Sequence, residues 1–119
     1  MKERSSITSS RNELRLKVLR ALETNPELSQ RQLAKKLGVS LGGVNYAIQA
    51  LIDKGFVKAH NLRRADNKAA YLYILTPSGL VKKTQLATAF LGRKLEEYDT
   101  LKQEIETLKD ESRVKHKTL

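Results

Sequence analysis

The chain has 119 residues, a formal net charge of +10 and no cysteine. This length fits one domain with an appendage, and the lack of thiols excludes disulfides, thiolate metal sites and a cysteine nucleophile. No apolar run approaches the length of a membrane span, and the polar first ten residues do not resemble a signal peptide, so we expect a cytoplasmic protein without a membrane partner.

Basic charge is concentrated in the first part of the chain. Residues 1–75 contain 14 Lys and Arg against 6 Asp and Glu, whereas residues 76–119 contain 9 against 7. A domain with such an excess attracts polyanions such as nucleic acid or an anionic lipid surface. Charge also aids solubility, so it does not by itself identify a ligand.

The chain is predicted to begin with a flexible, serine-rich arm over residues 1–9, followed by a first helix. Ser10 and Glu13 have the spacing of a capping box, in which two side chains satisfy the first amides of a helix. The helix should end near Thr24, because the residue before Pro26 is disfavoured in the helical conformation. Its apolar stripe repeats at Leu14, Val18 and Leu22.

Two short helices follow, separated by a tight turn. Ser29 and Gln32 form a second capping box, and Gly38 suits the left-handed residue that ends a helix. Only two residues separate the second helix from the next cap, Ser40, and the third helix should then run to Lys54. Two short helices joined by such a turn are typical of a helix-turn-helix.

A hairpin is predicted after the third helix, because the apolar pattern changes from helical to alternating beyond Gly55. The strands are expected at Phe56–Leu62 and Ala70–Leu75, joined by the polar, basic loop 63–69. A charged hairpin that follows a helix-turn-helix along the chain is called a wing. Residues 10–75 are therefore predicted to form a winged-helix DNA-binding domain.

The last predicted helix covers residues 76–113, with a frayed tail at 114–119. Thr76 suits the cap and Pro77 the first helical position, where its missing N–H costs nothing. Apolar residues continue at heptad spacing, which is typical of a coiled coil and predicts pairing with a second copy of the chain. The predicted dimerisation residues are Leu91, Leu95, Tyr98, Leu101, Ile105 and Leu108.

Three segments carry a resemblance to a known family. They are Leu-Gly-Val-Ser-Leu-Gly-Gly-Val-Asn-Tyr at 37–46, Leu-Ile-Asp-Lys-Gly-Phe-Val-Lys at 51–58 and Tyr-Ile-Leu-Thr-Pro-Ser-Gly-Leu at 73–80. They resemble the MarR-type winged helix-turn-helix regulators, and the Phe-Leu-Gly-Arg-Lys-Leu-Glu-Glu-Tyr stretch is similar to their short, exopolysaccharide-associated subgroup. The resemblance implies a mainly α fold with a small β-hairpin, in which a winged helix-turn-helix precedes a long C-terminal dimerisation helix.

The resemblance also implies a function. It points to a homodimeric transcription regulator that binds double-stranded DNA at a pseudo-palindromic operator, with exopolysaccharide genes as a candidate target. The chain departs from the wider family in lacking an additional N-terminal helix, so its C-terminal helix would supply most of the dimer interface. No ligand site is carried over from the family. The effector, the operator and the sign of regulation stay open.

Base reading is expected from the outward face of the third helix, since the N-terminal part of that helix enters the major groove in a helix-turn-helix. Asn45 and Gln49 are i, i+4 neighbours, and either carboxamide can bond adenine N6 and N7 together. Tyr46 can stack on a sugar, touch a thymine methyl or bond a phosphate. The alternative is that all three are ordinary polar surface.

Gly42 and Gly43 are unusual in a helix, because each costs up to about 1 kcal/mol relative to alanine. One explanation is close approach of the helix N-terminus to a phosphate. The other is a steric need where the second and third helices cross. The sequence favours neither.

Further contacts are expected to position the protein on the DNA backbone rather than to read bases. The first helix of the motif crosses the phosphates, and arginines of a wing suit the narrow minor grooves of A·T-rich DNA. Asn67 and Lys68 could also shape the wing turn. The full predicted DNA-contacting set is Ser29, Gln30, Arg31, Ser40, Gly42, Gly43, Asn45, Tyr46, Gln49, Arg63, Arg64, Asn67 and Lys68.

No group of residues points to catalysis, a metal or a cofactor. His60 and His116 are isolated, and nothing places a serine, a histidine and an aspartate as a triad. We therefore expect neither an enzyme nor a cofactor. The remaining alternative is a winged helix that docks protein or RNA, with its last helix in a heterotypic coiled coil.

Overall fold

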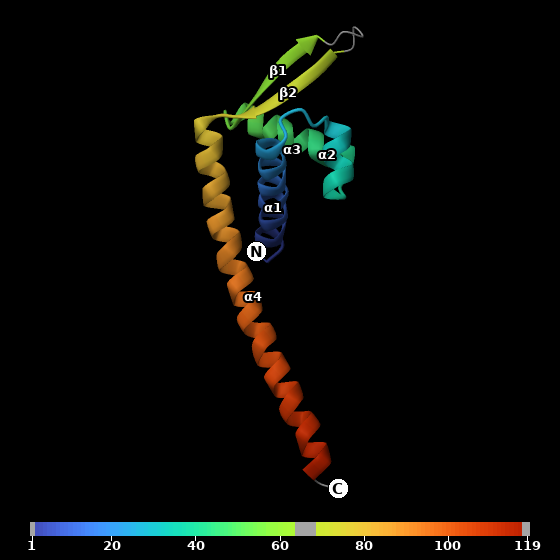
Figure 1. Ribbon diagram of the computed structural model, residues 1–119. Coiled ribbons are helices and arrows are strands. Elements are labelled where there is room, and N and C mark those ends of the chain that lie inside the picture. Colours follow the sequence, from blue (N-terminus) through green and yellow to red (C-terminus); the bar gives the residue numbers. More distant parts are fainter. Residues whose placement is uncertain (1, 64–68, 118–119) are drawn as a thin grey trace. The chain divides into compact units, whose positions relative to one another are not determined.

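The computed structural model describes residues 2–63 and 69–117 of the chain (Figure 1). Within these ranges, three helices, a two-stranded antiparallel hairpin and a fourth helix follow in that order. Their bounds are α1 Lys2–Thr24, α2 Gln30–Leu37, α3 Leu41–Asp53, β1 Val57–Arg63, β2 Ala69–Leu75 and α4 Pro77–Lys117. The predicted class, mainly α with a small hairpin and a long last helix, is confirmed.

The chain divides after Ala87 into two units. The first unit contains α1, α2, α3, the hairpin and the start of α4, and its hairpin projects beyond the cluster of the first three helices (Figure 1). Its core is aliphatic apart from one tyrosine, and every one of these elements contributes to it. The buried side chains are Leu16, Val18, Leu19, Ala21, Leu22, Leu33, Ala34, Val44, Ala47, Ile48, Leu51, Val57, Tyr73 and Leu86.

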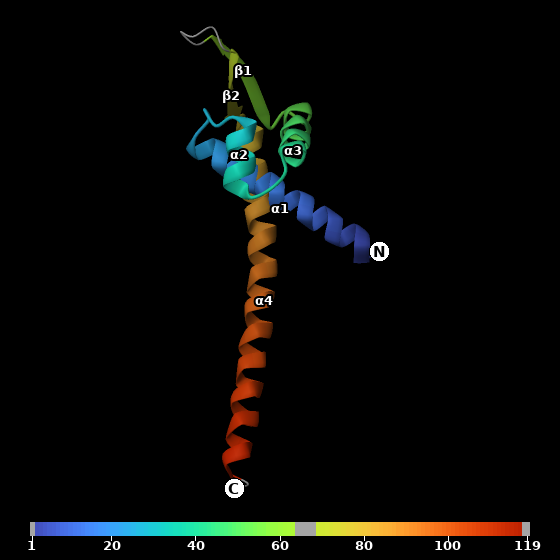
Figure 2. The same cartoon turned by 90° about the vertical axis from the view of Figure 1, so that its right-hand side faces the viewer.

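The first helix starts earlier than predicted. Because α1 begins at Lys2, the predicted flexible arm is wrong over residues 2–9, and Ser10 lies inside the helix rather than at its cap. Met1 lies outside the described residues. No glycine or proline precedes Pro26, and a serine inside a helix costs only about 0.5 kcal/mol relative to alanine, so nothing stops the helix from starting early. The N-terminal part of α1 runs on beyond α2 and α3 (Figure 2).

The helix-turn-helix has the local geometry that its capping residues predict. Ser29 Oγ accepts a hydrogen bond from Gln32 N at 3.1 Å, and Gln32 Oε1 accepts one from Ser29 N at 2.9 Å. Gly38 has a φ of 68°, in the left-handed region that favours glycine. Ser40 Oγ then accepts from Gly43 N at 3.0 Å and starts α3. Both predicted caps are confirmed.

The hairpin has the predicted position, with its strands shifted slightly. β1 begins at Val57, opposite Leu75, and each strand extends one residue further towards the loop than predicted. Arg63, expected in the loop, is instead the last residue of β1 and pairs with Ala69. The predicted wing-tip residues Arg64, Asn67 and Lys68 lie outside the described residues.

The start of α4 is fastened to the turn that follows α3. Thr76 Oγ1 accepts from Gly79 N at 3.1 Å, as expected of a cap, and also donates to Gly55 O at 2.6 Å. Ser78 Oγ donates to the same carbonyl oxygen at 3.0 Å, and Thr76 N donates to Phe56 O at 3.0 Å. The first turn of α4 is therefore held by both side-chain and backbone bonds.

The end of α4 differs from the prediction. The helix continues to Lys117, so the predicted frayed tail is wrong over residues 114–117, whereas residues 118–119 lie outside the described part. No proline or glycine follows Gly92 in the sequence to stop the helix. Of the helices in the described ranges, none is long and apolar enough to cross a membrane.

Candidate nucleic-acid interface

α3 has one buried and one exposed face. Its inward side chains are Val44, Ala47, Ile48 and Leu51. On the outward side, Asn45 and Gln49 are exposed, and Tyr46 keeps 62% of its surface in contact with solvent. The predicted outward position of Asn45, Tyr46 and Gln49 is confirmed. That its outward face contacts DNA stays a prediction.

Asn45 is held by a side chain from α2. Its Nδ2 donates a hydrogen bond to Gln30 Oε1 at 3.0 Å, and Gln30 Nε2 donates in turn to Tyr73 Oη at 3.1 Å. One glutamine thus connects the outward face of α3 with strand β2. Gln30 was predicted as a contact to the DNA backbone, but both ends of its carboxamide have partners within the chain.

Tyr73 is a site residue that the sequence reasoning missed. Its side chain is buried and receives the bond from Gln30, while its backbone N donates to Pro26 O at 3.1 Å. The signal available in the sequence was the alternation with Tyr71, which places both rings on one face of the hairpin. The rings lie parallel within 16°, with their centroids 6.1 Å apart.

Gln49 lies in a different environment from Asn45, although the sequence treats them as a pair. Its Nε2 donates to Asp53 Oδ1 at 3.0 Å, one turn further along α3. This bond leaves the carbonyl oxygen and one N–H of Gln49 for other partners. A carboxylate beside Gln49 also repels phosphates, so Asp53 disfavours close approach of the DNA backbone at this end of α3.

The two glycines of α3 are not required by the packing of helices in the described structure. A Cβ built on Gly42 meets no described atom within 4 Å, so the explanation by helix crossing is wrong for this residue. A Cβ on Gly43 would lie 3.1 Å from Ser40 Oγ, the cap of the same helix, and not against α2. The other explanation for Gly42, close approach of the helix N-terminus to a phosphate, stays a prediction.

The cations that the structure places near the start of the motif are exposed. Arg31 lies on the first turn of α2, and Lys35 and Lys36 lie on its last turn. Ser29, also predicted as a DNA contact, is exposed but uses its hydroxyl oxygen as the cap of α2. Arg31, Lys35 and Lys36 form no ion pair with a described carboxylate within 4 Å, so their charges are available to phosphates.

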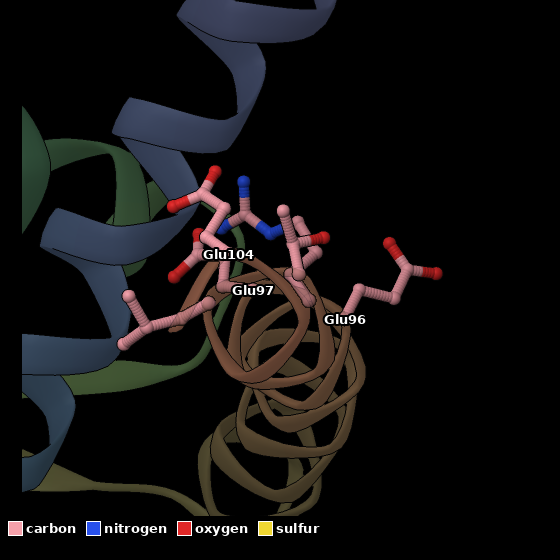
Figure 3. Close-up of a pocket in the computed structure, with 6 residues that line it drawn as sticks. Glu96, Glu97 and Glu104 are labelled. Atoms are coloured by element: carbon pink, nitrogen blue, oxygen red, sulfur yellow. The ribbon is translucent and has the colours of Figure 1, made fainter. Parts of the chain in front are cut away.

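The second unit offers an open depression rather than an enclosed site. It is lined by Arg93, Glu96, Glu97, Thr100, Leu101 and Glu104. All of these belong to α4, and Figure 3 shows Glu96 pointing away from Glu97 and Glu104. Across the described part of the chain, no group of three His, Asp or Glu side chains is placed to hold a metal ion.

The same part of α4 carries an exposed apolar stripe. The six residues predicted for dimerisation are all exposed, from 44% at Ile105 to 63% at Leu108. These six residues are called the seam. A lone helix with such a stripe leaves a large apolar surface in water, which is typical of an interaction face.

Comparison with known proteins gives a family model and a set of solved structures. Residues 11–58 match the model described as winged helix-turn-helix DNA-binding. No curated protein gives a significant match.

Three solved structures illustrate the similarity of fold. The chain is 23% identical to the adhesin competence repressor of Streptococcus pyogenes, with a TM-score of 0.57 over 76% of this chain and 65% of that one, just under two thirds of the repressor. A MarR/EmrR family transcriptional regulator from an Acinetobacter species is 18% identical, with a TM-score of 0.54 over 88% of this chain and 75% of that one. A transcriptional regulator homologue from Pyrococcus horikoshii is 20% identical, with a TM-score of 0.57 over 83% of this chain and 99% of that one. The chain therefore contains a winged helix-turn-helix of the DNA-binding type and has the fold of MarR-type transcription regulators.

Proposed function

We propose that this chain is a transcription regulator that binds double-stranded DNA sequence-specifically, as a homodimer on a pseudo-palindromic operator. The observation that carries the proposal is the outward face of α3, where Asn45, Tyr46 and Gln49 are exposed on a motif that matches DNA-binding domains. The excess of basic residues in the first 75 positions supports it, because phosphates dominate the affinity of such proteins.

In this proposal the residues divide into those that read bases and those that position the protein. Asn45 and Gln49 read base edges in the major groove, and Tyr46 contacts a sugar, a methyl group or a phosphate. The remaining predicted residues hold the DNA backbone or the minor groove. They are Ser29, Arg31, Ser40, Gly42, Gly43, Arg63, Arg64, Asn67 and Lys68.

Charges beside the seam favour a second copy of this chain as its partner. With Leu91, Tyr98 and Ile105 at heptad position a, the g positions are Glu97, Glu104 and Glu111, and the e positions after Leu95 are Lys102 and Lys109. In a parallel pair each g residue faces the e residue five positions along in the partner, so Glu97 meets Lys102 and Glu104 meets Lys109, while Glu111 faces His116. In an antiparallel pair glutamate would meet glutamate. The pattern therefore supports a parallel homodimer.

A selection experiment tests the proposal as a whole. The full-length chain is incubated with random duplexes, bound sequences are enriched, and the affinity for the selected duplex is compared with that for random DNA over a salt series. We expect a two-fold symmetric consensus and affinity that falls steeply with salt. Absence of any preference, together with a monomeric chain at micromolar concentration, would instead support docking of protein or RNA.

The resemblance to the exopolysaccharide-associated subgroup gives the proposal a target, the exopolysaccharide genes. The selected consensus should then occur upstream of exopolysaccharide genes in the genome that encodes the chain. Mapping where the protein binds on that genome measures this directly.

Asn45→Ala and Arg31→Ala are expected to affect binding in different ways. Loss of the Asn45 carboxamide should reduce discrimination at one base pair by about 1–3 kcal/mol and leave the salt slope unchanged. Loss of Arg31 should weaken binding to all duplexes and lower the slope of log affinity against log salt by about 0.9. Fluorescence anisotropy titrations at several salt concentrations measure both. If the two variants behaved alike, the division into reading and positioning residues would be wrong.

Gly42→Ala is expected to change stability and DNA binding in opposite directions. Because an added methyl group meets no atom of the described residues within 4 Å, alanine should stabilise α3 by up to about 1 kcal/mol. If the backbone at Gly42 approaches a phosphate closely, the same methyl should weaken DNA binding on the order of tenfold, as expected when one charge-assisted hydrogen bond is displaced. Urea unfolding and anisotropy measure the two effects. Unchanged DNA binding would remove the role of Gly42 in close approach.

A further inference from the structure

We infer that Gln30 is a positioning residue for sequence recognition, which holds the Asn45 carboxamide in the orientation that adenine requires. The inference rests on the proposed function. Its basis is the pair of hydrogen bonds that link Asn45 Nδ2 to Gln30 Oε1 at 3.0 Å and Gln30 Nε2 to Tyr73 Oη at 3.1 Å. These bonds join three elements of the first unit that are distant in sequence.

The chemistry of the carboxamide explains what the first bond achieves. An asparagine side chain has two N–H donors and one carbonyl acceptor. Gln30 takes one donor of Asn45, which leaves one N–H and the oxygen Oδ1. Adenine in the major groove offers an N6 donor and an N7 acceptor, so the remaining pair on Asn45 is its complement.

The same bond sets which end of the carboxamide faces outward. Without a partner, the amide of an exposed asparagine turns freely and presents its oxygen or its nitrogen equally. Gln30 Oε1 accepts only from the nitrogen of Asn45, so it keeps that nitrogen towards α2. Guanine, which shows two acceptors at O6 and N7, is then matched less well than adenine.

Gln30 can perform this role because its own position is constrained. Its side chain is half-buried, and its partner Tyr73 is 7% exposed and packed in the core of the first unit. One N–H of Gln30 Nε2 is directed at Tyr73, which leaves a single N–H for any contact to a phosphate. Gln49 has no comparable anchor, because its amide bonds to exposed Asp53 on its own helix.

The test compares three variants of the full-length chain on the selected duplex and on duplexes with each base pair changed in turn. Gln30→Met keeps the length of the side chain and removes both hydrogen bonds. Tyr73→Phe removes only the anchor of Gln30. Gln30→Glu keeps an acceptor for Asn45 and can accept a bond from the Tyr73 hydroxyl.

We expect Gln30→Met to reduce discrimination at the base pair read by Asn45 by about three- to tenfold, in the lower part of the range of coupling between side chains in one hydrogen-bond network. Tyr73→Phe should do the same to a smaller extent. Gln30→Glu should retain the wild-type discrimination, although its negative charge lowers affinity for every duplex. A duplex carrying 7-deaza-adenine at that position should bind the wild type, Gln30→Met and Tyr73→Phe with nearly equal affinity.

A double-mutant cycle separates positioning from independent contact. If Gln30 acts through Asn45, Gln30→Met should add nothing to the discrimination lost in Asn45→Ala. The inference is overturned if Asn45→Ala reduces discrimination and Gln30→Met does not, or if Gln30→Met weakens binding to all duplexes and lowers the salt slope. In both of these cases the proposed DNA-binding function stands.

A measurement on the free protein keeps the inference independent of DNA. In NMR spectra of the wild type, the two Asn45 side-chain amide protons should differ in temperature coefficient, because only one is hydrogen-bonded to Gln30. Gln30→Met should remove this difference, and Gln30→Glu should preserve it. Wild-type protein that shows no sequence preference for DNA would overturn the proposed function. Equal temperature coefficients for the two Asn45 side-chain amide protons in the wild type would overturn the positioning role alone.

Discussion

Gly79→Ala is expected to destabilise the first unit by about 2–4 kcal/mol, although alanine is the better helix former. The reason is steric. An added Cβ would overlap the backbone carbonyl oxygen of Phe56 and lie 2.9 Å from its carbonyl carbon, and neither atom belongs to a flexible side chain. To relieve the overlap, the first turn of α4 must move away from the turn after α3, which disrupts the bonds from Thr76 and Ser78 to Gly55.

Urea unfolding followed by circular dichroism, at fixed protein concentration, measures this loss. Gly92→Ala is the matched control, because it lies in the same helix and its Cβ would meet no described atom within 4 Å. The control should be neutral or stabilising by up to about 1 kcal/mol. Equal stability changes in the two variants would show that the start of α4 is not tightly held against Phe56.

Reversing the charge of Lys102 and Lys109 to glutamate is expected to separate the proposed dimer. In a parallel pair the two changes turn four attractive contacts into four repulsive ones. At about 0.5–1 kcal/mol for each exposed pair, the dimer loses roughly 2–4 kcal/mol, which raises its dissociation constant about 30- to 1000-fold. Lys109 also has an intrachain partner, Glu106, at 3.7 Å, but both side chains are more than half exposed and can exchange partners.

Analytical ultracentrifugation of the full-length chain at low salt measures the change. Asp110→Lys is the control, since Asp110 lies at heptad position f, away from the seam. A second variant with Glu97→Lys and Glu104→Lys should also be monomeric, and mixing it with the first should restore pairing as a heterodimer. Failure of the mixture to pair, or a first variant that stays dimeric, would contradict parallel pairing. Variants with a smaller fraction of dimer should bind a palindromic duplex with lower affinity.

The parts of the fold that the sequence predicts well depend on neighbouring residues. The caps at Ser29 and Ser40 and the left-handed Gly38 are set by contacts within four positions of each residue, so their spacing is sufficient to place α2 and α3. The predicted start of α1 at Ser10 is wrong because it also depends on local spacing alone. A capping box at Ser10 is a favourable start, but it does not prevent a helix from continuing through the residues before it.

The parts that the sequence does not predict depend on contacts between distant residues. Gln30 and Asn45 each look like polar surface on their own helices, and only the crossing of α2 and α3 brings their carboxamides together. Gly79 is likewise unremarkable in a helix start, until the backbone of Phe56 is placed against it. For the same reason the sequence could not decide the role of Gly42, whose free surroundings become apparent only in three dimensions.

Tyr73 connects β2 to the loop before α2, through its backbone N to Pro26, and to α2 itself, through its hydroxyl to Gln30. The hairpin and α3 are therefore coupled near the base of the hairpin and should move as one body. On DNA, the base pairs read in the major groove and those touched by the hairpin would then stay a constant number of steps apart. An operator could vary in base sequence between these two positions, but it could not gain or lose a base pair there without one of the contacts being lost.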